Sequence, residues 1–165
     1  KNANLLDRYK YIAVLDDDLV FTKTNTLDVL TKSMQKHDIS IMSPGNTNKD
    51  KTTYHKVMFT DLSSNSIYIT NFCEMGCMII ETKFLLLIKY VYEYLENPIK
   101  DFGFDYFICH LANFFQKKIG IHKYFGYINP TRKDERDTFR DYFEISPQKI
   151  LKPFKIKILN TIHNA

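Results

Sequence analysis

Three consecutive carboxylates, Asp16, Asp17 and Asp18, directly follow the apolar run 9–15. Neighbouring negative charges repel one another, and a bound cation removes that repulsion. Among divalent cations, Mg²⁺ and Mn²⁺ prefer carboxylate oxygens. Alternate side chains of an extended segment share a face, so we expect Asp16 and Asp18 to point the same way and Asp17 to turn aside. The triplet therefore predicts a site for Mn²⁺ or Mg²⁺ with Asp16 and Asp18 as ligands.

The segments around this triplet alternate between strand and helix patterns. The run 9–15 has the composition of a buried parallel strand. Further along the chain we expect a helix over 26–37, strands over 39–42 and 67–70, helices beginning at 82 and after the turn 101–105, and short strands over 119–121 and 124–128. This order predicts the α/β class, with a mostly parallel sheet flanked by helices. Ligands of such sheets bind beyond the carboxyl ends of the strands, where the triplet stands.

Length and charge narrow the class of protein. With 165 residues and a net charge of +4, the chain fits one ordinary domain and is too weakly basic to indicate a nucleic-acid partner. We expect residues 1–145 to form one domain and residues 146–165 to be a basic tail of that domain. The tail carries four lysines and no carboxylate, so we expect at most peripheral membrane contact. No run of apolar residues is long enough to predict a transmembrane helix.

Three cysteines, Cys73, Cys77 and Cys109, cannot all pair with one another. An odd number of cysteines in an otherwise ordinary domain is typical of a reducing compartment. We therefore expect free thiols and a cytoplasmic location. Aromatic residues at 102–107 and 124–127 have the types that stack on sugar faces, although core packing is the commoner role of such residues.

The order of several motifs points to a family. YIAVLDDDL (11–19), ISIMSPG (39–45), NFCEMGCMIIETKFL (71–85), DFGFDYFICHLA (101–112) and KKIGIHKYFGYINPTRK (117–133) follow one another along the chain. Together they resemble the glycosyltransferase-A fold, and within it a glycosyltransferase-like family first described as a domain of unknown function. The resemblance implies transfer of a sugar from a nucleotide-sugar donor, such as a UDP- or GDP-sugar, to a hydroxyl of a glycan or glycoprotein. Because only 15 residues precede the triplet, we expect either a trimmed fold or a fragment lacking its N-terminal nucleotide-binding part.

The resemblance also assigns roles to the acidic triplet and to one later residue. It implies that Asp16 and Asp18 bind the metal ion and that Asp17 contacts the ribose or the sugar of the donor. A late strand of this fold often supplies a third metal ligand. Asn129 stands at that place here, and His122 is the alternative.

Two further carboxylates match catalytic positions of the family. Glu74 belongs to the segment that lines the acceptor side of the site. Asp105 matches the carboxylate that contacts donor or acceptor and acts as a base, in which case the reaction inverts the anomeric carbon. Because Asp105 follows a glycine turn at a predicted helix start, we also expect the helix dipole to keep it ionised.

Two other functions remain compatible with the sequence. Asp16-Asp17-Asp18-Leu19-Val20 also fits the first motif of haloacid-dehalogenase-like phosphatases, with Asp16 as nucleophile, Asp18 as acid/base and Ser43 ending a second strand. That family needs a second acidic cluster after a downstream strand, which the sequence does not offer. The last alternative is a non-enzymatic domain that binds carbohydrate or a partner protein, without a metal ion.

Overall fold

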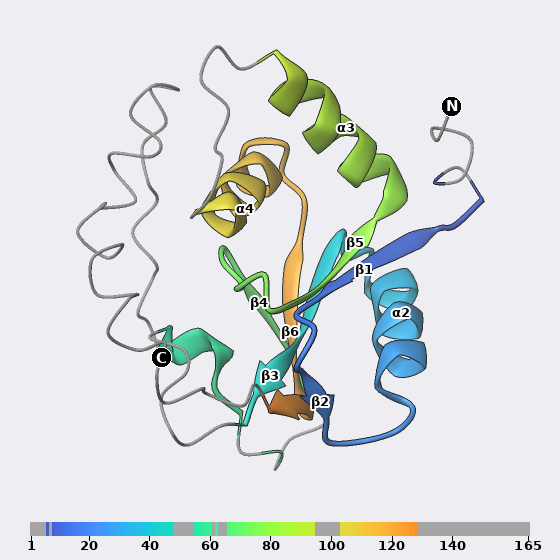
Figure 1. Ribbon diagram of the computed structural model, residues 1–165, viewed down its shortest axis with the longest axis vertical. Coiled ribbons are helices and arrows are strands. Elements are labelled where there is room, and N and C mark those ends of the chain that lie inside the picture. The colour runs from blue at the N-terminus through green and yellow to red at the C-terminus, as the bar shows by residue number, and fades with distance from the viewer. Residues whose placement is uncertain are drawn as a thin grey trace.

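A mixed β-sheet with helices on both faces forms the described part of the chain (Figure 1). The computed structural model describes residues 6, 8–47, 55–60, 62, 66–94 and 103–128. The elements are β1 (Tyr11–Leu15), β2 (Val20–Phe21), α2 (Thr26–His37), β3 (Ile41–Asn46), the 3₁₀ helix η1 (Lys56–Met58), β4 (Ile67–Thr70), β5 (Cys77–Glu81), α3 (Thr82–Glu93), α4 (Phe104–Phe114) and β6 (Ile119–Ile128). None of the helices in these ranges is long and apolar enough to cross a membrane.

The strand directions overturn the predicted fold class. Within the described residues, six strands form one sheet in the order β1-β5-β3-β6-β2, and β4 also pairs with β6. The pairs β1–β5, β3–β5, β2–β6 and β4–β6 are antiparallel, and β3–β6 is parallel. The predicted fold class, a mostly parallel, glycosyltransferase-A-like sheet flanked by helices, is therefore wrong: the described sheet is mostly antiparallel, with α2 packed on one face and α3 and α4 on the other. Because most strand pairs are antiparallel, most connections between paired strands are not the helical crossovers of a parallel sheet.

The first strand shows why the prediction failed. β1 lies at the edge of this sheet, pairs antiparallel with β5 through Leu15 and Cys77, and is not fully buried at any residue. Its outward-facing positions Ala13 and Leu15 are exposed, yet both are apolar. The polar and apolar alternation that marks a half-exposed strand is therefore hidden, and the run looks like a buried strand.

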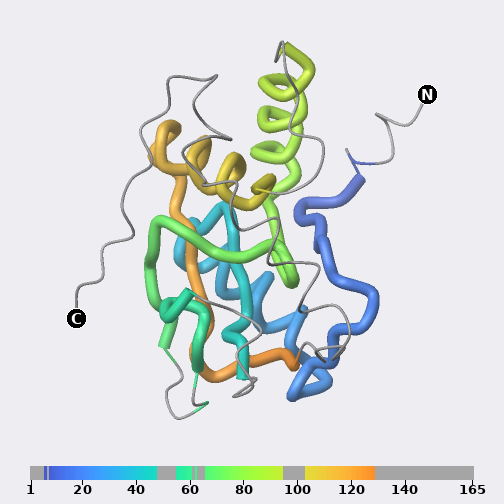
Figure 2. The backbone as a smooth tube through the Cα atoms, turned by 60° about the vertical axis from the view of Figure 1, so that its left-hand side comes forward, coloured from blue at the N-terminus to red at the C-terminus, as the bar shows by residue number. Residues whose placement is uncertain are grey.

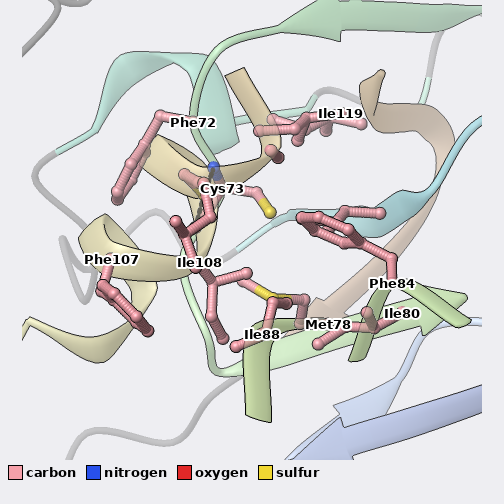
Figure 3. Packing of buried hydrophobic residues seen from close by; sticks show 14 of the residues in the cluster. Phe72, Cys73, Met78, Ile80, Phe84, Ile88, Phe107, Ile108 and Ile119 are labelled. Carbon is pink, nitrogen blue, oxygen red and sulfur yellow. Dashed lines mark hydrogen bonds between the residues drawn. The ribbon is translucent and has the colours of Figure 1, made fainter. Parts of the chain in front are cut away.

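Hydrophobic side chains pack on both faces of the sheet. On one face, Leu30 and Met34 of α2 pack with Met42, Ile79 and Phe125. On the other face, α3 and α4 lie next to each other (Figure 2), with Tyr92 and Phe104 ring centroids 5.6 Å apart. The buried residues of this second face include Met78, Ile80, Phe84, Ile88, Phe107, Ile108 and Ile119 (Figure 3). Met78 and Ile80 of β5 thus enter one cluster and Ile79 the other, which is the two-residue period of a strand.

Some predicted helices and strands have the expected bounds in the structure, and others do not. The helix over 26–37 and the strand over 67–70 are confirmed. The strand expected to stop before Ser43 continues to Asn46, and 119–128 is one strand with an irregular register beside Pro44 and Gly45. α4 ends at Phe114, because Gln116 adopts a left-handed conformation with φ of 54°.

Candidate functional site

The acidic triplet forms the connection between β1 and β2. The backbone N–H of Asp16 donates a hydrogen bond of 2.9 Å to the carbonyl of Gly76, which extends the β1–β5 pairing by one residue. Asp17 and Asp18 follow in a turn, so the expected extended geometry across Asp16 and Asp18 is not present. The side chains of Asp16 and Asp17 are exposed and that of Asp18 is half-buried. The turn offers carboxylates to solvent at the end of the sheet.

Glu74 lies in the connection between β4 and β5, two residues before the glycine that pairs with Asp16. Its backbone N–H contacts the sulfur of Met58 at 3.5 Å, which ties this connection to η1. The Glu74 side chain is half-buried. The β1–β5 pairing therefore brings the predicted metal-binding segment and the predicted acceptor-side segment next to each other.

Asp105 lies in the first turn of α4, after Gly103, which has a φ of 96°. Burial raises the pKa of the Asp105 carboxyl to about 6, although backbone hydrogen bonds, including one of 2.8 Å from the N–H of Tyr106, act in the opposite direction. We expected the helix dipole to keep this group ionised, but burial has the larger effect. A carboxyl group with a pKa near 6 is suited to accept a proton close to neutral pH.

Two tyrosines lie within range of the charges of these carboxylates. Burial raises the pKa of Tyr127 well above its ordinary value, and the charges of Glu74 and Asp16 raise it further. Burial, followed by the charges of Asp105 and Glu74, raises the pKa of Tyr106 to about 12. Asp16, Glu74 and Asp105 come from three separate segments. The charge of Glu74 thus acts on both tyrosines, whereas that of Asp16 acts on Tyr127 and that of Asp105 acts on Tyr106.

Sequence reasoning included both tyrosines only as members of the aromatic runs 102–107 and 124–127. Tyr127 is 1% exposed and belongs to the hydrophobic cluster under α4, so its aromatic run 124–127 is partly core. Tyr106 stands directly beside Asp105 in the sequence, and this adjacency was the available signal. His55 was also missed, because it lies at the end of a polar segment without helix or strand periodicity.

Of the two proposed third metal ligands, Asn129 and His122, the structure describes only His122. Asn129 lies outside the described residues, which end at Ile128 in β6. His122 is 3% exposed, and its ring packs edge-on against Phe125, with centroids 5.0 Å apart, in the cluster under α2. Burial, and then the charge of Lys23, lower the pKa of His122. His122 is therefore a core residue of the opposite face.

The phosphatase alternative places Ser43 near Asp16. Ser43 lies inside β3, is fully buried and donates a hydrogen bond of 2.9 Å to the carbonyl of Pro44. β5 separates β3 from β1, so the two strands lie about 10 Å apart at the usual spacing of strands. The described structure does not bring these two motifs together.

Comparison with known proteins adds a fold likeness. Neither a protein-family profile nor a curated protein sequence matches the chain. Among solved structures, the crystal structure of A197 from STIV is similar, with a TM-score of 0.50 and 17% sequence identity over 78% of this chain. The match covers 63% of A197, so the chain spans less than two thirds of that protein. At this identity the likeness concerns the fold alone, and a shared fold does not imply a shared activity.

Proposed function

We propose that this chain is a metal-dependent glycosyltransferase, which moves a sugar from a nucleotide-sugar donor to a hydroxyl acceptor. The observation that supports this function best is that the β1–β5 pairing brings the segments of Asp16 and Glu74 side by side, while Glu74 and Asp105 both raise the pKa of Tyr106. The sequence pattern assigned these carboxylates to the metal side, the acceptor side and the base of one reaction. A single active site requires all three carboxylates to face the same substrate.

The acidic turn has the chemistry to hold a divalent cation. Asp16 and Asp18 offer carboxylate oxygens, the donors that Mn²⁺ and Mg²⁺ prefer. The described residues include no group of three His, Cys, Asp or Glu side chains arranged to hold a metal ion. Mg²⁺ is usually bound by one or two protein carboxylates and completes its shell with water and substrate phosphates. Asp16 and Asp18 would hold the ion in this way, and the ion would offset charge on the departing nucleoside diphosphate.

The remaining carboxylates act on the acceptor. Asp105 takes the proton of the acceptor hydroxyl, whose oxygen then forms a bond to the anomeric carbon of the donor. The bond between that carbon and the diphosphate breaks, and the diphosphate leaves with the electron pair. Glu74 lies on the acceptor side, where it accepts hydrogen bonds from sugar hydroxyls. A direct displacement of this kind inverts the anomeric carbon.

Calorimetric titration with UDP, GDP and their sugars, with and without Mn²⁺, tests the proposal. We expect binding that depends on Mn²⁺, and we expect Asp18→Asn to abolish that dependence because it removes a ligand charge. Asp38→Asn is the matched control. Asp38 is exposed, precedes β3 at the opposite end of the sheet, and has a left-handed conformation that asparagine also tolerates.

The outcomes separate the candidate functions. Metal-dependent nucleotide binding that survives Asp38→Asn and is lost in Asp18→Asn supports the transferase. Normal turnover by Asp18→Asn would refute the assignment of this residue to the metal. Absence of nucleotide binding together with binding of beryllofluoride at Asp16 would favour the phosphatase instead.

A further inference from the structure

A cluster of three rings lies beside the candidate base. His55 precedes η1, Phe72 follows β4, and Tyr106 lies in the first turn of α4. The ring centroids of His55 and Phe72 are 4.3 Å apart, those of Phe72 and Tyr106 are 4.9 Å apart, and those of His55 and Tyr106 are 5.8 Å apart. Each ring comes from a different segment, so the cluster joins three parts of the chain next to Asp105.

The polar atoms of this cluster form a pair. The hydroxyl of Tyr106 and Nε2 of His55 are 3.1 Å apart, within hydrogen-bond distance. Because the pKa of Tyr106 is raised to about 12, its hydroxyl keeps its proton at neutral pH. A protonated tyrosine hydroxyl donates one hydrogen bond and still accepts others. Whichever partner donates in this pair, the Tyr106 oxygen keeps at least one acceptor position, which can accept a hydrogen bond from a hydroxyl group.

The exposure of the three rings shows which of them a ligand can reach. Phe72 is 4% exposed and forms the floor of the cluster, whereas His55 and Tyr106 are half-buried. Apolar ring surface beside a small number of polar atoms is the usual composition of a small-molecule site. A sugar presents the matching surface, because its C–H groups can lie on a ring while its hydroxyls donate and accept hydrogen bonds.

We propose that His55 and Tyr106 form the subsite that binds a hydroxyl of the acceptor, and that this acceptor is a carbohydrate. The inference rests on the proposed transferase function, since it places the acceptor beside Asp105 and Glu74. Tyr106 is adjacent to Asp105 in the first turn of α4, and its hydroxyl feels the charges of both carboxylates. A sugar bound at the ring pair would thus lie within range of the charge of the proposed base.

The test measures sugar binding in the absence of metal and nucleotide. Methyl glycosides of glucose, galactose and mannose are the probes, and saturation-transfer NMR is the readout. We expect the wild-type protein to bind at least one of them. Tyr106→Phe keeps the ring and removes only the hydroxyl, so it should weaken binding by about tenfold. The matched control is Tyr90→Phe, on a helix tyrosine that is 58% exposed, and it should bind like wild type.

A double variant tests whether the two residues act as a pair. If His55 and Tyr106 bind the same hydroxyl, His55→Ala combined with Tyr106→Phe should weaken binding little more than the stronger single variant. In turnover assays, Tyr106→Phe should raise the KM for the acceptor and leave the KM for the donor unchanged. Binding of no glycoside by the wild type, or equal binding by Tyr106→Phe, would overturn the subsite.

The two proposals fail in different ways. Manganese-dependent nucleotide binding without glycoside binding would remove the acceptor subsite and leave the transferase intact. Glycoside binding that depends on Tyr106, in a protein that binds no nucleotide, would support the ring pair as a sugar site and refute the transferase.

Discussion

Asp105 should make the folded protein less stable at neutral pH, because its carboxyl must be charged in a buried place. Its pKa rises from the ordinary value of 3.8 to about 6, a difference of about 2.2. One pKa unit corresponds to about 1.4 kcal/mol, so the ionised carboxylate costs the fold at most about 3 kcal/mol. Asp105→Asn removes the charge and retains an oxygen that accepts the hydrogen bond from Tyr106. We therefore expect the variant to be more stable than wild type and inactive.

The pH dependence of this difference follows from proton binding. Between pH 3.8 and about 6 the folded carboxyl holds a proton that the unfolded chain has released. Wild-type stability should therefore fall as the pH rises through this window, and it should stay lower above it. The difference in the free energy of unfolding between Asp105→Asn and wild type should be near zero below pH 4 and largest above pH 7.

Urea denaturation at pH 4 and pH 7.5, without metal or nucleotide, measures both gaps in the free energy of unfolding. Asp28→Asn is the control, since Asp28 also lies in the first turn of a helix but is exposed and pairs with Lys32 at 2.7 Å. That variant should lose about 0.5 kcal/mol or less at pH 7.5. If Asp105→Asn proves no more stable than wild type at pH 7.5, burial does not control this carboxyl and the argument for a base near pH 6 fails.

Two further predictions concern the surroundings of the site. Gly103→Ala should lower the free energy of unfolding by about 1–2 kcal/mol, because a side chain at φ 96° is strained; an unchanged urea midpoint would show that the α4 start adapts freely. Cys73, Cys77 and Cys109 are at most 2% exposed, and burial contributes to raising the pKa of Cys77 to about 12. Their thiols should therefore react with a disulfide reagent only as fast as the protein unfolds, and rapid labelling of the native protein would contradict this burial.

Local patterns predicted several elements but not β2 or β5, and the directions of the strands required tertiary contacts. The helix 26–37 follows from its apolar spacing, and the strand 67–70 from its β-branched and aromatic residues. β3 runs past Pro44 because β5 pairs only with Ile41 and Met42, so at Pro44 the described partner strand is β6, and a strand with a neighbour on one side tolerates proline. The antiparallel pairing of β1 could not be predicted from its own residues, because its partner strand β5 begins only at Cys77, far along the chain from Leu15.

The residues of the candidate site also differ in whether they could be selected from the sequence. Asp16, Glu74 and Asp105 could be selected from the sequence, because carboxylates are recognisable as candidate ligands and bases from their residue type alone. Tyr127 and His55 could not, because a buried tyrosine in an apolar strand resembles ordinary core, and a histidine in a polar loop has no periodic pattern. The raised pKa of Asp105 could not be predicted from the sequence either, because it depends on how deeply α4 buries the carboxyl group.

The central position of β6 has a consequence for how the chain acquires its structure. β6 pairs with β2, β3 and β4, and the Thr22 hydroxyl bonds the Gly126 carbonyl across 104 residues of sequence. Pairings of such long sequence separation are closed late and slowly in folding. On the ribosome, β2 and β4 must therefore wait for β6 to emerge before the sheet can close. During that interval their unpaired backbone groups are open to a chaperone or to a neighbouring nascent chain.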